Sequence, residues 1–269
     1  MIDCKKIASR HKSYIKELLQ SIEYVPTLAV IQVGNNAASN SYIKGKKSDC
    51  EEVGINFIHY KFEEDCKDND ILDLIDQLNL DENINGIIVQ MPLPEHMDKE
   101  RILCSIADGK DVDGFKPNSK FTPCTPMGVM TILQEIGIDV DGEVCCVIGR
   151  GEVGRPMVNL LAQHNATVIW CNSHTNKYLL DRMIDISNII ISATGQAGLI
   201  KNVPNYKIVI DVGISRGEDG KLYGDVDKSN YSEDALITSV PGGVGLMTRV
   251  SLLENVICAA KGIDNTKLL

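Results

Sequence analysis

The sequence lacks the residue spacings that proteins use to hold zinc. No two of its nine cysteines form a Cys-x-x-Cys pair, and its five histidines show no His-Glu-x-x-His spacing. These absences exclude zinc-ribbon and thioredoxin-like sites, and we expect no metal site. Because the number of cysteines is odd and the chain is not small, we expect reduced thiols in a cytoplasmic protein.

Long apolar runs and an excess of positive charge are also missing. No run approaches the roughly 20 residues of a membrane span, and the charged N-terminal stretch MIDCKKIASRHKSYIKELL lacks the apolar core of a signal peptide. The formal net charge of −10 repels a polyanion over most of the surface. We therefore expect neither a membrane nor nucleic acid as a partner.

The first half of the chain alternates between apolar runs and helical segments. The runs at 27–33, 55–62 and 85–91 predict strands, and the segments at 38–53 and 69–79 predict helices. This strand–helix–strand order indicates a parallel sheet covered by helices.

A segment rich in Gly, Pro and Asp at 108–128 predicts a loop or domain crossover, after which the alternation restarts. EVCCVIG, ATVIW, NIIISATG, KIVIDVG and ALITSV predict strands, while MGVMTILQEIG, EVGRPMVNLLAQH, NKYLLDRMI and the final GLMTRVSLLENVICAAKG predict helices. The expected fold class is α/β with two domains, each a mostly parallel sheet flanked by helices, and a cleft between them. The expected domains are 1–120 with 247–269, and 121–246, the second of Rossmann type.

A glycine loop is the sharpest local signal. Gly149, Gly151 and Gly154 satisfy G-x-G-x-x-G directly after an apolar run and at the start of a predicted helix. In this context glycines allow a tight turn and a close approach of the backbone to a pyrophosphate at the helix N-terminus. We interpret the loop as a dinucleotide site; the alternative is a plain turn between strand and helix.

The next strand bears on the choice of dinucleotide. It ends in CNSHT, without the carboxylate that often binds the ribose hydroxyls of NAD. Arg150 in the glycine loop and Ser173 after this strand could instead bind a phosphate. The pattern favours NADP, with NAD possible, although Arg150 could also form a surface salt bridge.

Polar side chains follow the first three predicted strands. Tyr42 and Lys46 are spaced i, i+4 and so share a helix face, Gln90 ends the third strand, and Asp111 and Asp113 lie in KDVDG. Ligands of open α/β sheets bind at the carboxyl ends of strands, which makes these residues candidates for a substrate site.

Each candidate has a plainer interpretation. Lys46 lies in a charge run that could be a solvated helix face, and Tyr42 could be a core or edge aromatic. DVDG is usually a turn, and the other ligands of a twelve-residue calcium loop are missing. Composition does not choose among these interpretations.

Eight motifs in order carry a resemblance to a known family: SYIKGKKSDCEEVGI, GIIVQMPLP, KDVDGF, PCTPMG, IGRGEVGRP, VIDVGI, GDVD and PGGVGLMT. Together they resemble the bifunctional methylenetetrahydrofolate dehydrogenase/cyclohydrolase family over residues 27–257. The resemblance implies an enzyme that oxidises 5,10-methylenetetrahydrofolate to the 5,10-methenyl form with NADP. The same cleft then hydrolyses the product to 10-formyltetrahydrofolate. It also implies a homodimer formed through the cofactor domain.

The resemblance also implies site roles. Lys46 matches the catalytic lysine, Gln90 the glutamine that positions it, Tyr42 the tyrosine that stacks on the aminobenzoate ring, and Asp113 the aspartate that holds the pterin. Substrate contacts extend to Pro92, Gly242 and Gly243. The positions that match cofactor contacts are Gly149, Arg150, Gly151, Gly154, Ser173, Gly195 and Ile214.

The chain departs from the family pattern at several positions. The glycine loop is one residue shorter than usual and has Gly151 in place of Ser, which bears on NADP against NAD. Lys116 replaces a His, and the segment 116–122 is shortened. Asn172 stands where His is common, and Leu246 replaces a Pro. None of these changes removes a catalytic position.

Two other functions compete with this interpretation. Another NAD(P)-dependent oxidoreductase, such as a shikimate-dehydrogenase-like enzyme, also pairs a lysine with an aspartate but has no use for an aminobenzoate-stacking Tyr42. A non-catalytic nucleotide-binding protein is disfavoured because Lys46, Gln90 and Asp113 are retained together.

Overall fold

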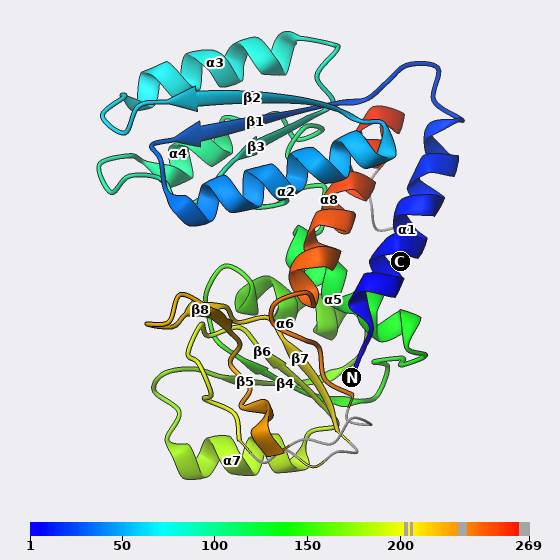
Figure 1. Cartoon of the computed structure of the whole chain (residues 1–269), viewed down its shortest axis with the longest axis vertical. Coiled ribbons are helices and arrows are strands. Elements are labelled where there is room, and N and C mark those ends of the chain that lie inside the picture. Colours follow the sequence, from blue (N-terminus) through cyan, green and yellow to red (C-terminus); the bar gives the residue numbers. More distant parts are fainter. Residues whose placement is uncertain (202–203, 205–206, 231–235, 264–269) are drawn as a thin grey trace. The chain divides into compact units, whose positions relative to one another are not determined.

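The computed structural model describes residues 1–201, 204, 207–230 and 236–263 (Figure 1). The chain forms two compact units, each with its own sheet. The β1 unit comprises Arg10–Cys124 and Arg249–Leu269, and the β4 unit comprises Met1–Ser9 and Thr125–Thr248. The chain passes from one unit to the other after residues 9, 124 and 248. The domain boundaries predicted from the sequence lie after residues 120 and 246.

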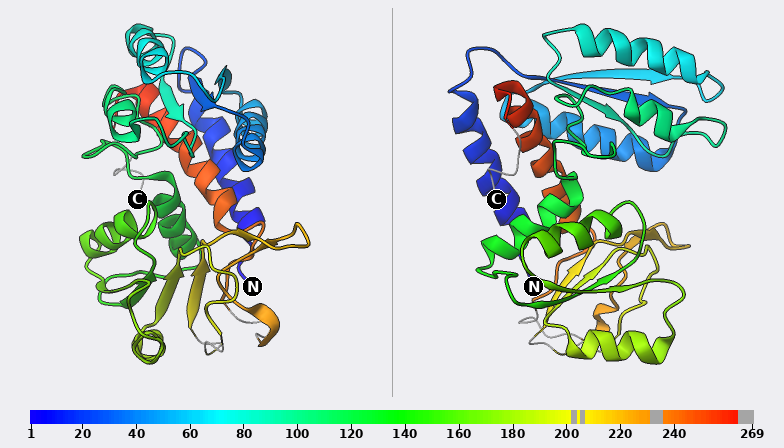
Figure 2. Two further views of the ribbon diagram at one scale, coloured as in Figure 1. Left: turned by 90° about the vertical axis from the view of Figure 1, so that its left-hand side faces the viewer. Right: turned by 180° about the vertical axis from the view of Figure 1, so that it is seen from behind.

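The β1 unit contains a three-stranded parallel sheet in the order β2-β1-β3. Helices α3 and α4 lie on one side of this sheet and α2 on the other (Figures 1 and 2). The elements of the unit are β1 Thr27–Val33, α2 Ala37–Val53, β2 Asn56–Phe62, α3 Asp68–Leu80, β3 Gly86–Val89 and α4 Lys99–Cys104. Helices α1 Cys4–Leu19 and α8 Val244–Lys261 contribute residues to both units.

Alternation along the strands explains the core on the α3 side. Every residue of β1 is buried, and Ala29, Ile31 and Val33 face a cluster that includes Ile71 and Ile75 of α3. Successive strand residues point to opposite faces, so the intervening residues of β1 face the α2 side. A strand buried on both faces is a nearly continuous apolar run, as TLAVIQV is; its two polar residues, Thr27 and Gln32, are buried as well.

Helix α2 carries two of the candidate site residues and has well-defined ends. The Asn36 side chain accepts hydrogen bonds from the N–H groups of Ala38 and Ser39, which caps the N-terminus. Gly54 ends the helix in the left-handed conformation with φ of 94°. The caps set the helix register and therefore which α2 residues face the sheet.

The β4 unit contains a four-stranded parallel sheet in the order β5-β4-β6-β7 and a short antiparallel β8-β9 pair. Its core cluster includes Cys146 and Ile148 of β4 and Ile190 of β6. The elements are α5 Cys124–Glu135, β4 Val144–Ile148, α6 Gly154–Gln163, β5 Thr167–Cys171, α7 Lys177–Ile186, β6 Ile189–Ser192, β7 Ile208–Asp211, β8 Ser215–Arg216, β9 Leu222–Tyr223 and the 3-10 turn η1 Lys228–Asn230. The predicted fold class, two domains with parallel sheets flanked by helices, is confirmed.

One predicted strand is wrong in its described part. ALITSV begins at residue 235, outside the described residues, and the rest forms a single bridge between Val209 and Ile237. The pairing with β7 does not continue past this bridge, because the N–H of Asp211 donates to the Thr238 hydroxyl at 2.8 Å and not to a backbone carbonyl. Within the described ranges, no helix is long and apolar enough to cross a membrane.

Candidate functional site

Lys46 is buried, although it lies in a run of charged residues. Its side chain is 9% exposed, whereas the neighbouring Lys47 is exposed. The Lys46 Nζ donates a hydrogen bond to Oε1 of Gln90 at 3.1 Å. Nε2 of Gln90 donates to the Met91 carbonyl at 2.8 Å, so the amide oxygen is the atom that faces the lysine. A solvated helix face is therefore wrong for Lys46, and the structure brings this lysine and glutamine together.

Tyr42 lies one helical turn before Lys46 and is not a core aromatic. Its side chain is 39% exposed, which leaves part of the ring available to a ligand. Partial burial raises the pKa of Tyr42, and the nearby Arg249 guanidinium opposes this shift. The phenol is therefore neutral at physiological pH, as an aromatic stacking surface requires.

An ion-pair cluster that the sequence analysis did not identify surrounds this face of α2. The buried Asp49 carboxylate accepts hydrogen bonds from Lys12 Nζ at 2.5 Å and from Nε of Arg249. Gly45 makes room for Arg249, since a Cβ there would lie 3.2 Å from its Nη1. Lys12 and Arg249 come from opposite ends of the chain, so no local pattern predicts the cluster.

Asp113 lies in a loop that is held on both flanks. The Asn255 amide of α8 donates to the carbonyls of Val112 at 2.8 Å and Thr122 at 3.3 Å. The N–H of Cys124 donates to the carbonyl of Asp113 at 3.4 Å. These bonds fix the backbone beneath a partly exposed carboxylate, which is a suitable arrangement for binding a ligand amino group.

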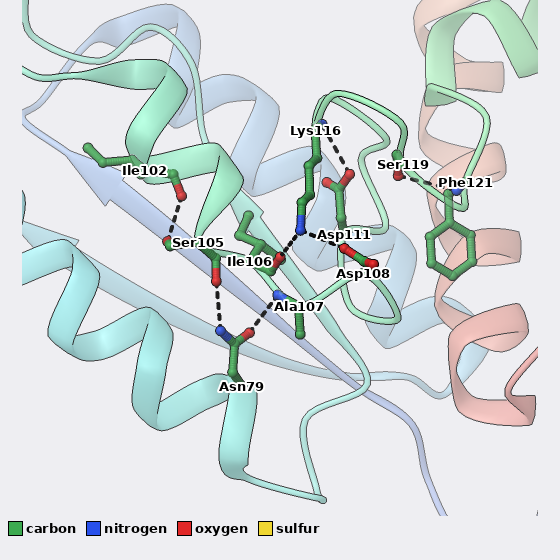
Figure 3. A network of polar contacts seen from close by, with 10 residues as sticks. All are labelled: Asn79, Ile102, Ser105, Ile106, Ala107, Asp108, Asp111, Lys116, Ser119 and Phe121. Atoms are coloured by element: carbon green, nitrogen blue, oxygen red, sulfur yellow. Dashed lines mark hydrogen bonds and ion pairs between the residues drawn. The ribbon is translucent and has the colours of Figure 1, made fainter.

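Asp111, the other carboxylate of KDVDG, is a structural residue (Figure 3). It is 1% exposed, and burial raises its pKa. Its Oδ2 accepts the N–H of Lys116 at 3.1 Å. The Lys116 ammonium donates to the Ile106 carbonyl at 3.0 Å and to Asp108 at 2.5 Å. Lys116, which stands where the family has a His, therefore ties the shortened loop to the end of α4.

The structure gives no support to a calcium site at DVDG. No group of three or more His, Cys, Asp or Glu side chains that could hold a metal ion occurs in the part of the chain that the structure describes. Asp111 instead accepts a hydrogen bond from the N–H of Lys116 within the loop.

The glycine loop has the shape that a pyrophosphate requires. Gly149 has φ of +118°, and a Cβ there would lie 2.4 Å from the Ala193 carbonyl oxygen. A Cβ on Gly154 would lie 2.2 Å from the Gly149 carbonyl oxygen, whereas a Cβ on Gly151 would meet nothing within 4 Å. The first and third glycines thus pack backbone against backbone, and the second leaves open space beside the N-terminus of α6. The loop fits a dinucleotide.

The other predicted cofactor residues follow strands of the same sheet. Arg150 and Ser173 are exposed after the adjacent strands β4 and β5. Asn172, where His is common, accepts the N–H of His174 at 2.9 Å and so shapes the turn around Ser173.

Gly195 and Ile214 are brought together in the β4 unit. Gly195 has φ of +67°, and a Cβ there would lie 3.5 Å from the Ile214 carbonyl oxygen. Gly242 and Gly243 belong to this unit too, and a Cβ on Gly243 would lie 2.1 Å from the Ser239 carbonyl oxygen. Pro92 is exposed in the β1 unit, just after Gln90.

Comparisons with known proteins agree with this geometry. The model of the tetrahydrofolate dehydrogenase/cyclohydrolase catalytic domain matches residues 2–113, and that of the family's NAD(P)-binding domain matches residues 123–264. The bifunctional protein FolD of Acetivibrio thermocellus is 41% identical over an alignment of 277 positions that covers 97% of this chain and 96% of that protein.

Solved structures give the same result. The crystal structure of the bifunctional enzyme FolD from Campylobacter jejuni has a TM-score of 0.91 and 41% identity, covering 97% of this chain and 98% of that one. The Trypanosoma brucei enzyme, complexed with NADP and an inhibitor, has a TM-score of 0.89 and 29% identity over 97% of both chains. The chain therefore belongs to the tetrahydrofolate dehydrogenase/cyclohydrolase family.

Proposed function

We propose that this protein is a bifunctional folate enzyme. It oxidises 5,10-methylenetetrahydrofolate to 5,10-methenyltetrahydrofolate with NADP and then hydrolyses the product to 10-formyltetrahydrofolate. The observation that carries the proposal is the buried Lys46 held by Gln90 at 3.1 Å in a member of this family. Because the hydrogen bond to Gln90 fixes the position of the amine, Lys46 can act as an oriented acid–base group. Family membership disfavours the shikimate-dehydrogenase-like alternative.

The β1 unit supplies the groups that would hold the folate. The partly exposed ring of Tyr42 stacks on the aminobenzoate, and the Asp113 carboxylate accepts hydrogen bonds from the amino edge of the pterin. Pro92 would line the same site. The rigid loop beneath Asp113 and the capped helix beneath Tyr42 supply the preorganisation that an orientation effect requires.

In the hydrolysis, Lys46 handles the proton of the attacking water. The water oxygen bonds to the methenyl carbon while its proton passes toward Nζ of Lys46. The bond from this carbon to N5 then breaks as N5 takes up the proton held by Lys46. The new hydroxyl loses its proton to solvent and becomes the carbonyl of the formyl group on N10, so that one proton is released overall. Gln90 holds Nζ in place because its own NH₂ group is bonded to a carbonyl and its oxygen faces the amine.

The β4 unit would bind the dinucleotide, which accepts the hydride when bound. Gly149, Gly151 and Gly154 would hold the pyrophosphate, and Gly195 and Ile214 would contact the nicotinamide end. The resemblance to the family assigns substrate contacts to Gly242 and Gly243. Exposed Arg150 and Ser173 at the ends of β4 and β5 favour the extra phosphate of NADP. The resemblance further supports a homodimer. None of the nine cysteines, all of which lie in the described part of the chain, forms a disulfide, which supports a cytoplasmic location.

A pair of lysine variants tests the proposal. The wild type should turn over methylenetetrahydrofolate faster with NADP than with NAD, and methenyl absorbance should not accumulate if hydrolysis follows. Lys46→Met should lower hydrolysis at least ~100-fold, since general acid–base groups contribute about 10²- to 10⁴-fold. Lys47→Met is the matched control, because Lys47 is exposed and its Nζ lies 3.8 Å from Glu51; it should keep both activities.

Each other outcome is informative. Equal hydrolysis by Lys46→Met and the wild type would show that the assigned mechanism is wrong. Turnover with NAD alone would mean that the shortened glycine loop outweighs Arg150. No turnover by the wild type with either dinucleotide would refute the dehydrogenase activity.

A further inference from the structure

Two carboxylates in the β4 unit are fully buried and have no part in the site described so far. Asp211 ends β7, Asp225 follows β9, and both are 0% exposed. Buried carboxylates are costly unless donors surround them. The donors around this pair indicate what it does.

Asp225 binds both sides of the turn that contains Gly195. Its Oδ2 accepts the Ser192 hydroxyl and the N–H of Thr194, each at 2.7 Å, and its Oδ1 accepts the N–H of Gln196 at 2.9 Å. All three partners are donors, and two of them are backbone groups that flank Gly195. The conformation of this turn is therefore set by one carboxylate.

Asp211 in turn holds the segment that carries Asp225. Its two oxygens accept the N–H groups of Asp225 at 2.9 Å and Val226 at 3.2 Å. The packing leaves no space for a side chain on either neighbouring glycine. A Cβ on Gly213 would lie 1.9 Å from Asp225 Oδ1, and one on Gly224 would lie 2.0 Å from Asp211 Oδ2. The glycines of VIDVGI and GDVD are thus explained by the carboxylate pair.

The turn that Asp225 holds lies against the predicted dinucleotide residues. Gly149 of the glycine loop approaches the Ala193 carbonyl so closely that a Cβ would lie 2.4 Å from its oxygen. Gly195 adopts a positive φ of 67° beside the Ile214 carbonyl. Residues 193–196 therefore connect the pyrophosphate loop to the residues assigned to the nicotinamide.

We propose that Asp225 is a positioning residue for the pyridine dinucleotide, and that Asp211 acts through Asp225. The inference rests on the proposed function, because that function places the dinucleotide beside Gly149 and Gly195. Asp225 contacts the turn rather than the cofactor. Its contribution is to hold the Thr194 and Gln196 backbone in the binding conformation before the dinucleotide arrives, which lowers the ordering cost of binding.

A carboxylate is specifically required at this position. Asparagine has nearly the same shape, but its NH₂ group is a hydrogen-bond donor and would face another donor, with which it cannot form a hydrogen bond. Either Gln196 N–H or the Ser192 and Thr194 donors would lose their acceptor. The turn then relaxes, while the rest of the unit keeps its packing.

The test is calorimetric titration of the full chain with NADP. Asp225→Asn should weaken NADP binding about tenfold or more, and the KM for NADP should rise more than kcat falls. Asp227→Asn is the matched control two residues away, since the Asp227 carboxylate accepts from Ser229; its Kd should stay within about twofold of the wild type. Hydrolysis of methenyltetrahydrofolate uses no NADP and should be unchanged in both variants.

The outcomes separate this inference from the proposed function. If the wild type binds NADP and Asp225→Asn binds it equally well, the positioning role is refuted while the enzyme assignment stands. If the wild type binds neither NADP nor NAD, the proposed function fails and this inference fails with it. Should Asp225→Asn not fold, Ser192→Ala removes one donor, and its Kd should rise by a smaller factor; an unchanged Kd would refute the role.

Discussion

At the scale of single residues, the tight packing around Gly224 has a measurable consequence. A Cβ at this position would lie 2.0 Å from Asp211 Oδ2, a buried atom that cannot move into solvent. Overpacked substitutions typically cost about 1–3 kcal/mol. We expect Gly224→Ala to lower the free energy of unfolding by about 3 kcal/mol, measured as a lower urea midpoint.

Gly109→Ala is the control for this substitution. A Cβ on Gly109 would meet nothing within 4 Å, and its backbone is not in the left-handed region. The free energy of unfolding of this variant should stay within about 0.5 kcal/mol of the wild type. Equal midpoints for both variants would show that the Asp211 environment accommodates a methyl group.

Residue-scale prediction from the sequence works where spacing alone decides. The i, i+4 spacing places Tyr42 and Lys46 on one face of α2, and the structure has both residues there. Which lysine of KGKK is buried depends instead on Gln90, 44 positions later. Arg249 reaches Asp49 across 200 positions, and no local pattern contains such a contact.

At the scale of secondary-structure elements, strand β7 ends in a carboxylate with an unusual pKa. Burial raises the pKa of Asp211 to about 6, and the hydrogen bonds from the N–H groups of Asp225 and Val226 oppose this shift. The charge of Asp225 adds a smaller upward shift, and Lys228 opposes it. A raised carboxyl pKa stabilises the fold below the unfolded-state value near 4. This contribution is lost as the pH rises through about 6.

Asp211→Asn should isolate this effect. The wild type should lose unfolding free energy relative to the variant between about pH 4 and pH 6, by at most about 3 kcal/mol. The variant also lacks one acceptor for the Asp225 and Val226 N–H groups, which lowers its stability at every pH. Urea unfolding across this range measures the difference; a constant or opposite trend would contradict the assigned pKa.

Elements are predictable from the sequence when they are long and periodic. The largely apolar runs TLAVIQV and KIVIDVG contain β1 and β7, because strands buried on both faces are nearly continuous apolar runs. ALITSV is also largely apolar, but there the Thr238 hydroxyl replaces a backbone carbonyl as the acceptor for the N–H of Asp211, and no strand forms in the described part. The two-residue strands β8 and β9 are too short to carry a period.

At the scale of the whole molecule, the two units should respond to different ligands but unfold together. Helices α1 and α8 each contribute residues to both units, and a helix that continues across a boundary couples unfolding on its two sides. We therefore expect one thermal transition. A ligand at about 100 times its Kd stabilises the native state by about 2.7 kcal/mol, which should raise the midpoint by roughly 5 °C.

Two variants should divide the ligand responses between the units. Asp225→Asn should lose about half or more of the midpoint shift with NADP, because a tenfold higher Kd lowers the stabilisation from about 2.7 to about 1.4 kcal/mol at the same ligand concentration. It should keep the shift with a tetrahydrofolate that is not turned over. Tyr42→Ala should show the reverse pattern, because its ring belongs to the β1 unit and Asp225 to the β4 unit. Loss of both shifts in either variant would mean that the two sites are not separate. Two resolved transitions would mean that α1 and α8 do not couple the units.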